Sequence, residues 1–135
     1  MTLVDTNVLI DLVTADPNWL GWSAARINEA IDRGPLLIND VIYAEISTRF
    51  DQEEQLEVVL RTIGIVVAPI PRSALFLAGK AFVQYRRSGG VKTRVLSDFL
   101  IGAHAATEHL SLLTRDARHY RTYFPNVDLI TPDRG

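Results

Sequence analysis

The segment LVDTNVLIDL, residues 3–12, places a carboxylate directly after a short apolar run. The residues before Asp5 are typical of a β-strand that enters a core, and a second apolar run, VLI, follows two positions later. Asp5 therefore either ends the strand as a turn residue or stands there for chemistry. We interpret the other acid of this segment, Asp11, as structural, facing solvent or a neighbouring helix.

Short runs rich in Val, Ile and Leu recur along the chain and predict the strands of a sheet. They are TLV (2–4), PLLI (35–38), IVV (65–67), SLLT (111–114) and VDLI (127–130). Segments with helical spacing lie between these runs, and we expect helices near 18–32, 40–50, 52–62, 71–87 and 97–109. This alternation predicts a three-layer α/β fold, with a mostly parallel central sheet of four to five strands flanked by helices.

The composition is that of a folded globular protein. The 135 residues are 47% apolar and 22% charged, and this length predicts one domain covering 1–135. No run approaches the roughly 18 apolar residues of a membrane-spanning helix, so we expect a soluble, cytoplasmic protein. The absence of cysteine excludes disulfides and thiolate chemistry. A net charge of −2 argues against nucleic-acid binding by bulk electrostatics, but allows local contacts.

Four acids adjoin the predicted strands and helices: Asp5, Glu45, Asp98 and Asp116. In a parallel sheet the strand C-termini and helix N-termini share one edge, where such folds bind ligands. Individually, Asp98 beside Ser97 could cap a helix, and Asp116 could belong to a turn. Glu45 differs, because it lies among apolar residues of a predicted helix, where an unpartnered carboxylate is rarely buried. Asp40, at the start of that helix, we interpret as its cap.

Carboxylates gathered in one cleft repel each other and raise each other's pKa unless cations hold them. Oxygen ligands of this kind suit Mg²⁺ or Mn²⁺, which bind through one or two carboxylates each and take further ligands from water and substrate phosphates. A site of this composition therefore predicts metal-dependent hydrolysis of phosphodiester bonds.

Four segments resemble successive motifs of the PIN-domain ribonucleases, and most closely those of the VapC-type toxins of toxin–antitoxin pairs. They are VDTNVLIDL (4–12), YAEI (43–46), LSDFLIGAHA (96–105) and LLTRDARHYRTYFP (112–125). The resemblance spans nearly the whole chain, with the motifs in order. It implies a PIN-like fold and an endoribonuclease that acts as a toxin. Such a toxin would cleave tRNA or rRNA and inhibit translation until its antitoxin neutralises it.

The resemblance also implies a set of site residues. The metal ligands would be Asp5, Glu45, Asp98 and Asp116, with Mg²⁺ or Mn²⁺ as the cofactor. Asn7 would help to hold the first carboxylate or a water, and Thr114 would place a hydroxyl near the metal. Some members carry a further acid beyond the fourth, which would serve a second metal ion. This chain instead has Ala117, Arg118 and His119 at those positions.

Basic residues near the acids are candidates for RNA binding. They are Arg86, Arg87, Lys92, Arg94 and Arg115. The first four surround Gly89 and Gly90, and the alternative explanation is a solvated surface turn. Phosphate contacts from these cations would give affinity without sequence readout. The three histidines have no common metal-ligand spacing, and we assign no catalytic role to His104, His109 or His119.

Trp19, Leu20 and Trp22 form an apolar group at the start of a predicted helix. Such residues most often belong to the core. The family resemblance offers another interpretation, because early helices in this family help to form the groove for the antitoxin, and a partner helix requires an apolar surface. The resemblance further implies a homodimer, on which higher assemblies with the antitoxin are built.

Three other functions remain open. An aspartyl phosphatase of the haloacid dehalogenase type would need a second Asp two residues after Asp5, where this chain has Asn7. A PIN nuclease could instead process ribosomal RNA or cut structured DNA. A PIN-like domain could also act as a binding module without catalysis, and the presence of all four acids argues against that role.

Overall fold

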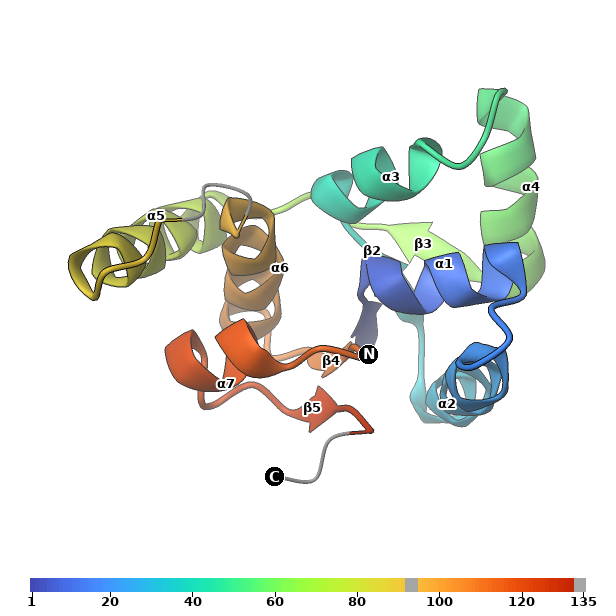
Figure 1. Cartoon of the computed structure of the whole chain (residues 1–135). Helices are drawn as coiled ribbons and strands as arrows, with labels where there is room; N and C mark the ends of the chain where they lie inside the picture. The colour runs from blue at the N-terminus through green and yellow to red at the C-terminus, as the bar shows by residue number, and fades with distance from the viewer. Residues whose placement is uncertain (92–94, 133–135) are drawn as a thin grey trace.

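The computed structural model describes residues 1–91 and 95–132, whose strands form one five-stranded sheet in the order β3-β2-β1-β4-β5 (Figure 1). Every pairing among these strands is parallel. The strands are β1 (Thr2–Val4), β2 (Leu36–Ile38), β3 (Ile65–Val67), β4 (Ser111–Leu113) and β5 (Leu129–Ile130). All five lie within the apolar runs from which they were predicted, and the α/β fold class is confirmed.

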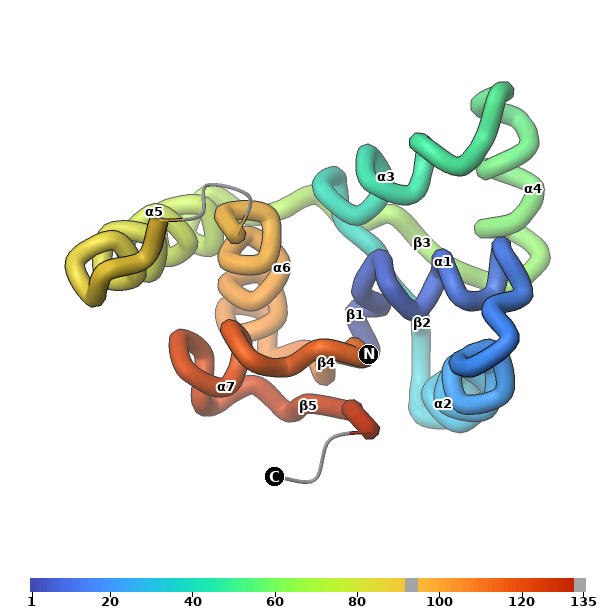
Figure 2. Tube along the Cα trace, viewed as in Figure 1, coloured from blue at the N-terminus to red at the C-terminus, as the bar shows by residue number. Residues whose placement is uncertain are grey.

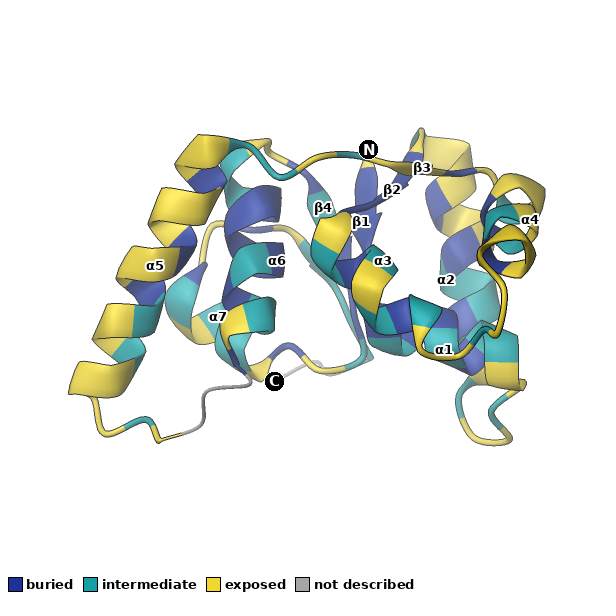
Figure 3. Ribbon diagram, turned by 90° about the horizontal axis from the view of Figure 1, so that it is seen from above, coloured by how far each residue is buried: buried dark blue, intermediate teal, exposed yellow. Residues whose placement is uncertain are grey.

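The described residues also form seven helices. They are α1 (Thr6–Thr14), α2 (Leu20–Arg33), α3 (Asp40–Ser47), α4 (Glu53–Ile63), α5 (Arg72–Arg87), α6 (Leu96–Thr107) and α7 (Arg118–Tyr123). Helices α5, α6 and α7 lie on one side of the sheet and α1, α2 and α4 on the other, while α3 contacts both α1 and α6 (Figures 1 and 3). In the described part of the chain, none of these helices combines the length and apolar character needed to cross a membrane.

The order of the strands creates one reversal in the sheet. From β1 the chain builds outward through β2 to β3 at one edge, then crosses to α5 on the other side of the molecule (Figure 2). It returns through α6 to β4, which pairs with the opposite side of β1. The connections after β1 and β4 therefore leave in opposite directions. The crevice at their C-terminal ends is the place where open α/β sheets bind ligands.

Two helices were not predicted from the sequence. The run after Asp5 forms α1, whose side chains Val8 and Leu9 are buried in the core. A short apolar run cannot be assigned to strand or helix by periodicity alone, which explains why α1 was missed. Helix α7 has only six residues, too few for a clear helical pattern.

The cap of α3 was predicted wrongly. The side chain of Asn39, not Asp40, accepts a hydrogen bond from the backbone N–H of Ile42 at 3.0 Å. Asp40 is instead the first residue of the helix, where a negative charge interacts favourably with the helix dipole. The helix also ends at Ser47, earlier than the expected end near residue 50.

Asp11 is structural, as predicted, but it is completely buried and does not face solvent. Its Oδ2 accepts hydrogen bonds from Ser23 Oγ in α2 and from Arg115 Nε in the loop after β4, both at 2.7 Å. A buried charge is tolerated only when it is paired and hydrogen-bonded. Asp11 therefore joins α1 to the neighbouring helix and to the segment that follows β4.

Close packing between α6 and α7 leads to a first prediction. A Cβ atom added to Gly102 in α6 would overlap the ring of Phe124 and lie 3.1 Å from Tyr120 Cδ1. We expect Gly102→Ala to lower the free energy of unfolding by about 1–3 kcal/mol, because an overpacked core must shift. Urea unfolding followed by circular dichroism measures this change.

The matched control is Gly79→Ala in α5, an exposed helical position where an added Cβ meets nothing within 4 Å. This variant should be as stable as the original or more stable, by about 0.5–1 kcal/mol, because alanine favours helix over glycine. Equal stability of the two variants would contradict the packing argument.

Candidate active site

The four predicted acids line one pocket at the C-terminal ends of β1 and β4. The pocket has a volume of about 280 Å³. Its lining residues are Asp5, Thr6, Asn7, Ile10, Glu45, Asp98, Asp116 and His119. The acids come from four places along the chain: the end of β1, helix α3, the first turn of α6 and the loop after β4. The fold therefore brings together carboxylates that are as much as 111 residues apart in sequence.

Asp5 is the buried member of this group and is held by three donors. The backbone N–H of Thr6 donates to Oδ1 at 2.7 Å, which makes Asp5 the N-cap of α1. The hydroxyls of Thr114 and Tyr120 donate to Oδ2 at 2.8 and 2.9 Å. Burial raises the pKa of Asp5 from 3.8 to about 6, although these hydrogen bonds oppose the shift. A carboxylate has about four acceptor positions, so Oδ1 keeps one for a ligand in the pocket.

Glu45 is oriented by α1 and by the anchoring of its own helix. Thr6 donates its hydroxyl to Glu45 Oε1 at 2.6 Å, which supplies the partner that a glutamate on an apolar helix requires. Asn39 caps α3 and also contacts the buried His104 of α6, with 3.1 Å between Asn39 Nδ2 and His104 Nδ1. An amide nitrogen can only donate, so His104 Nδ1 accepts, and burial lowers the pKa of this imidazole. The contact fixes α3 relative to α6, which carries Asp98.

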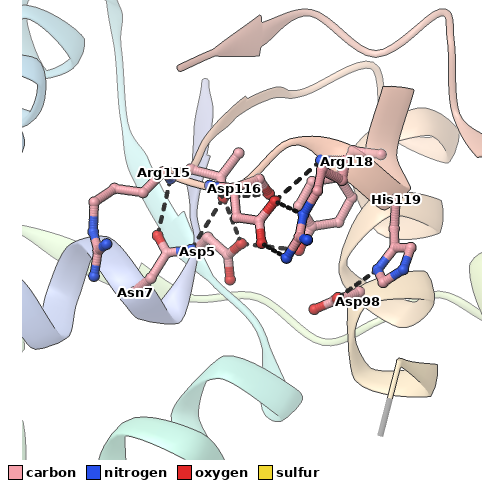
Figure 4. A network of polar contacts seen from close by, with 9 residues as sticks. Asp5, Asn7, Asp98, Arg115, Asp116, Arg118 and His119 are labelled. Carbon is pink, nitrogen blue, oxygen red and sulfur yellow. Dashed lines mark hydrogen bonds and ion pairs between the residues drawn. The ribbon is translucent and has the colours of Figure 1, made fainter. Parts of the chain in front are cut away.

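Asp98 stands in the first turn of α6, where the helix dipole favours negative charge. His119 Nδ1 lies 3.1 Å from Asp98 Oδ2 (Figure 4). Partial burial raises the pKa of Asp98, the nearby Asp116 raises it further, and His119 acts in the opposite direction. Asp98 is thus a carboxylate whose charge is costly in the protein alone and would be stabilised by a cation.

Asp116 is held by Arg118, two residues later in the chain. The guanidinium donates from Nε to Oδ1 at 2.9 Å and from Nη2 to Oδ2 at 2.7 Å (Figure 4). The backbone N–H of Arg118 also donates to Oδ1 at 3.2 Å. These contacts lower the pKa of Asp116, so this acid is ionised well below neutral pH.

Asn7 and Thr114 form a second layer around Asp5. Asn7 Nδ2 donates to Thr114 Oγ1 at 3.2 Å, and Asn7 Oδ1 accepts the backbone N–H of Arg115 at 3.1 Å. Thr114 in turn donates to Asp5. Asn7 therefore reaches the first carboxylate through Thr114, and it ties the start of α1 to the loop after β4.

The predicted cations and apolar residues lie in varied surroundings. Arg86 and Arg87 end α5, whereas Lys92 and Arg94 lie outside the described residues. The Arg115 guanidinium pairs with Asp11 at 2.7 Å and lies 5.0 Å from the centre of the Trp19 ring. Its side chain therefore serves the packing of α1 and α2, which is a different role from the predicted RNA contact.

Of the predicted partner surface, Trp19 and Trp22 are half-buried and pack edge to face, with ring centres 6.0 Å apart. Trp22 also packs against the core. Leu20, at the start of α2, is exposed. The group therefore combines core residues with an apolar side chain that faces solvent.

Sequence reasoning missed four residues of this site: Thr6, Arg118, His119 and Tyr120. Tyr120 had no signal of its own, because its partner Asp5 lies 115 residues away in sequence. Thr6 adjoins Asp5, but its hydroxyl contact with Glu45, 39 residues away, could not be read from the sequence. His119 follows Asp116 by three residues, so its position near the acids was the signal that could have found it. Arg118 stands where some family members carry an acid, and its contact with Asp116 was not predicted.

The chemistry of the pocket fits a divalent cation of the Mg²⁺ type, because four carboxylates line it. The raised pKa of Asp5 and of Asp98 also indicates that their negative charges lack full compensation within the protein. Within residues 1–91 and 95–132, however, no three acids or histidines already stand close enough to share one ion. Arg118 instead pairs with Asp116, and His119 lies against Asp98. Holding a cation would therefore require small side-chain movements, chiefly at the exposed Asp116.

The parallel sheet, the reversal between β1 and β4 and the acidic pocket together define an α/β domain of the PIN type. The sequence profile of the PIN domain matches residues 2–125. The chain belongs to the PIN-domain family, as its motifs predicted. No curated protein matches the sequence.

Solved structures from several bacteria share this fold. A chain of the VapBC2 complex of Rickettsia felis, bound to a promoter DNA fragment, is 18% identical, with a TM-score of 0.75 and 98% of each chain covered. A chain of FitAcB from Neisseria gonorrhoeae is 19% identical, with a TM-score of 0.70 and 98% of each covered. A toxin–antitoxin complex from Klebsiella pneumoniae gives 23% identity, a TM-score of 0.62 and the same coverage. At these identities the similarity shows a shared fold.

The raised pKa of Asp5 leads to a second prediction. Between pH 3.8 and about 6 the folded protein keeps a proton on Asp5 that the unfolded chain releases. The stability of the metal-free protein should therefore fall as the pH rises through this range. Asp5→Asn should remove up to about 3 kcal/mol of this dependence, since each pKa unit corresponds to about 1.4 kcal/mol. Urea unfolding of both proteins at pH 4 and pH 7, with a chelator present, measures this effect. The same pH dependence in Asp5→Asn as in the original protein would contradict a raised pKa at Asp5.

Proposed function

We propose that this protein is a divalent-metal-dependent endoribonuclease that acts as the toxin of a toxin–antitoxin pair. Its substrate would be tRNA or rRNA, whose cleavage inhibits translation until the antitoxin neutralises the enzyme. The observation that carries the proposal is the convergence of Asp5, Glu45, Asp98 and Asp116 on one pocket. Membership of the PIN family supports nuclease activity, and the fold shared with VapBC and FitAB complexes supports the role as a toxin.

The four acids would hold Mg²⁺ or Mn²⁺. A divalent cation bound there supplies positive charge to the scissile phosphate and lowers the pKa of water, which is the chemistry that phosphodiester hydrolysis needs. Asp5 would keep its position through Thr6, Thr114 and Tyr120, so that its free acceptor position points to the ion. Glu45 and Asp98 would contribute carboxylates to the ion from α3 and α6.

The substrate would be held by cations around the acids. Arg86 and Arg87 end the helix that precedes α6, and we keep them, with Lys92 and Arg94, as candidates for phosphate binding. Arg115 is a weaker candidate, because it already pairs with the buried Asp11. Single-stranded RNA or RNA loops fit a surface of this kind best, since proteins recognise RNA chiefly through unstacked bases and backbone shape.

The partner would be a cognate antitoxin that contacts the start of α2. Here Leu20 is exposed beside the half-buried Trp19 and Trp22, an arrangement suited to the apolar face of a partner helix. We further propose that the toxin is a homodimer and that antitoxin-bound assemblies are built on this dimer. Exposed apolar residues of α5, including Phe76, offer a separate surface for the dimer contact.

Replacing one pocket acid tests the catalytic proposal. Asp98→Asn should reduce Mg²⁺- or Mn²⁺-dependent RNA cleavage by at least about 100-fold, because the site would lose a charged ligand of the ion. Asp40→Asn is the matched control, since Asp40 is exposed on α3 and does not line this pocket. Cleavage of a labelled RNA by both purified, folded variants is the measurement. Full activity in Asp98→Asn would rule out the assignment.

A second pair of variants tests the partner surface. Leu20 and Leu77 have nearly equal exposure, 37% and 38%, but belong to α2 and α5. Leu20→Glu should weaken co-purification with the small protein encoded by the adjacent reading frame, because it places a charge on the apolar contact. Leu77→Glu should leave co-purification unchanged, because the proposed antitoxin contact lies on α2 and the exposed α5 face is assigned only to the dimer. If both variants bind the partner as well as the original protein does, the antitoxin site lies elsewhere.

A further inference from the structure

Arg118 makes a two-point contact with Asp116 that covers both carboxylate oxygens. Nε meets Oδ1 at 2.9 Å, Nη2 meets Oδ2 at 2.7 Å, and the backbone N–H of the same residue adds a third contact to Oδ1. This fork geometry is the strongest way in which an arginine binds a carboxylate. After these three contacts Asp116 keeps one acceptor position, on Oδ2, but the positively charged guanidinium beside it repels a cation while the contact lasts.

The other acids of the pocket are held differently. Asp5 accepts from a backbone N–H and two hydroxyls, and Glu45 accepts from the hydroxyl of Thr6. Asp98 has an imidazole as its neighbour. Within residues 1–91 and 95–132, Arg118 is the one arginine whose guanidinium is described in contact with any of the four pocket acids.

The contact is also placed where it can open. The Arg118 side chain is 82% exposed and that of Asp116 is 49% exposed. Ion pairs in such surroundings are weak, because water solvates both charges and the long side chain loses freedom in the pair. When the contact opens, water can solvate the guanidinium, so opening does not leave an unpaired charge buried in the protein.

We propose that Arg118 is an internal counterion that competes with the divalent cation for Asp116 and thereby sets the cation concentration at which the site fills. This inference rests on the metal-dependent function proposed above and deepens it. In the metal-free protein Arg118 takes the place of a cation beside Asp116, where it offsets part of the repulsion among the acids. A bound divalent ion displaces it. Arg118 is a positioning residue in this scheme, since it acts on the metal site through Asp116.

Calorimetric titration of the metal-free protein with Mn²⁺ tests the competition directly. Arg118→Gln should bind Mn²⁺ about two- to fivefold more tightly than the original protein, the change expected from losing one exposed ion pair. Arg118→Lys should lie between the two, because lysine keeps the charge but lacks the fork. Arg121→Gln, which removes the same charge one turn further along α7, should leave the affinity unchanged.

Salt provides an independent readout. The difference in affinity between Arg118→Gln and the original protein should shrink at about 1 M NaCl, where exposed charges are screened within about 3 Å. A merely structural role for Arg118 would not produce this dependence. Far-ultraviolet circular dichroism and thermal melting of each variant establish that it is folded.

The outcomes separate this inference from the proposed function. If the original protein binds Mn²⁺ and Asp98→Asn loses cleavage, but folded Arg118→Gln binds with equal or lower affinity, the competition is disproved and the nuclease proposal stands. If Arg121→Gln gains as much affinity as Arg118→Gln, the effect is one of total charge, and the specific contact is disproved. If no variant binds Mn²⁺ or Mg²⁺, both proposals fail.

Discussion

The burial of the Asp5 carboxylate at the end of β1 is the constraint on which the rest of this structure depends. An ionised group removed from water needs hydrogen bonds to replace its hydration. The protein supplies them from three segments: the first N–H of α1, the hydroxyl of Thr114 after β4 and the hydroxyl of Tyr120 in α7. These donors require β1, β4 and α7 to meet at one point. Even so, the pKa stays raised, and the charge remains available to a cation.

The topology of the sheet explains why the other acids gather there. Because the connections after β1 and β4 diverge, an opening forms above these two strands, and neighbouring helices reach it from both sides. Helix α3 brings Glu45 and α6 brings Asp98, and the buried contact between Asn39 and His104 fixes the two helices to each other. The geometry of the acids is thus set by buried polar contacts that are not themselves part of the pocket.

Two aspartates of the first motif have separate tasks. Asp11 is buried outside the pocket. Its contacts with Ser23 and Arg115 fasten α1 to α2 and to the loop after β4. Asp5 faces the pocket and meets only neutral donors among its described hydrogen bonds. Asp11 keeps a buried Oδ1 without a hydrogen-bond partner, but it does not line the pocket, whereas Asp5 lines it and has a free acceptor position there. Asp116 also lines the pocket, but it is paired with the exposed Arg118.

The sequence by itself determined the five strands, most of the helices and the four acids of the pocket, because apolar runs, helical periodicity and motif order are local properties. It did not determine α1, the capping of α3 by Asn39 or the contacts of Arg115, Arg118 and Tyr120. Thr114 and Tyr120 are more than 100 residues from Asp5, and Arg115 is equally remote from Asp11. Their partners depend on which strands become neighbours and how closely the helices approach. Only the tertiary structure decides this, because the burial that makes each contact necessary exists only after the chain has folded.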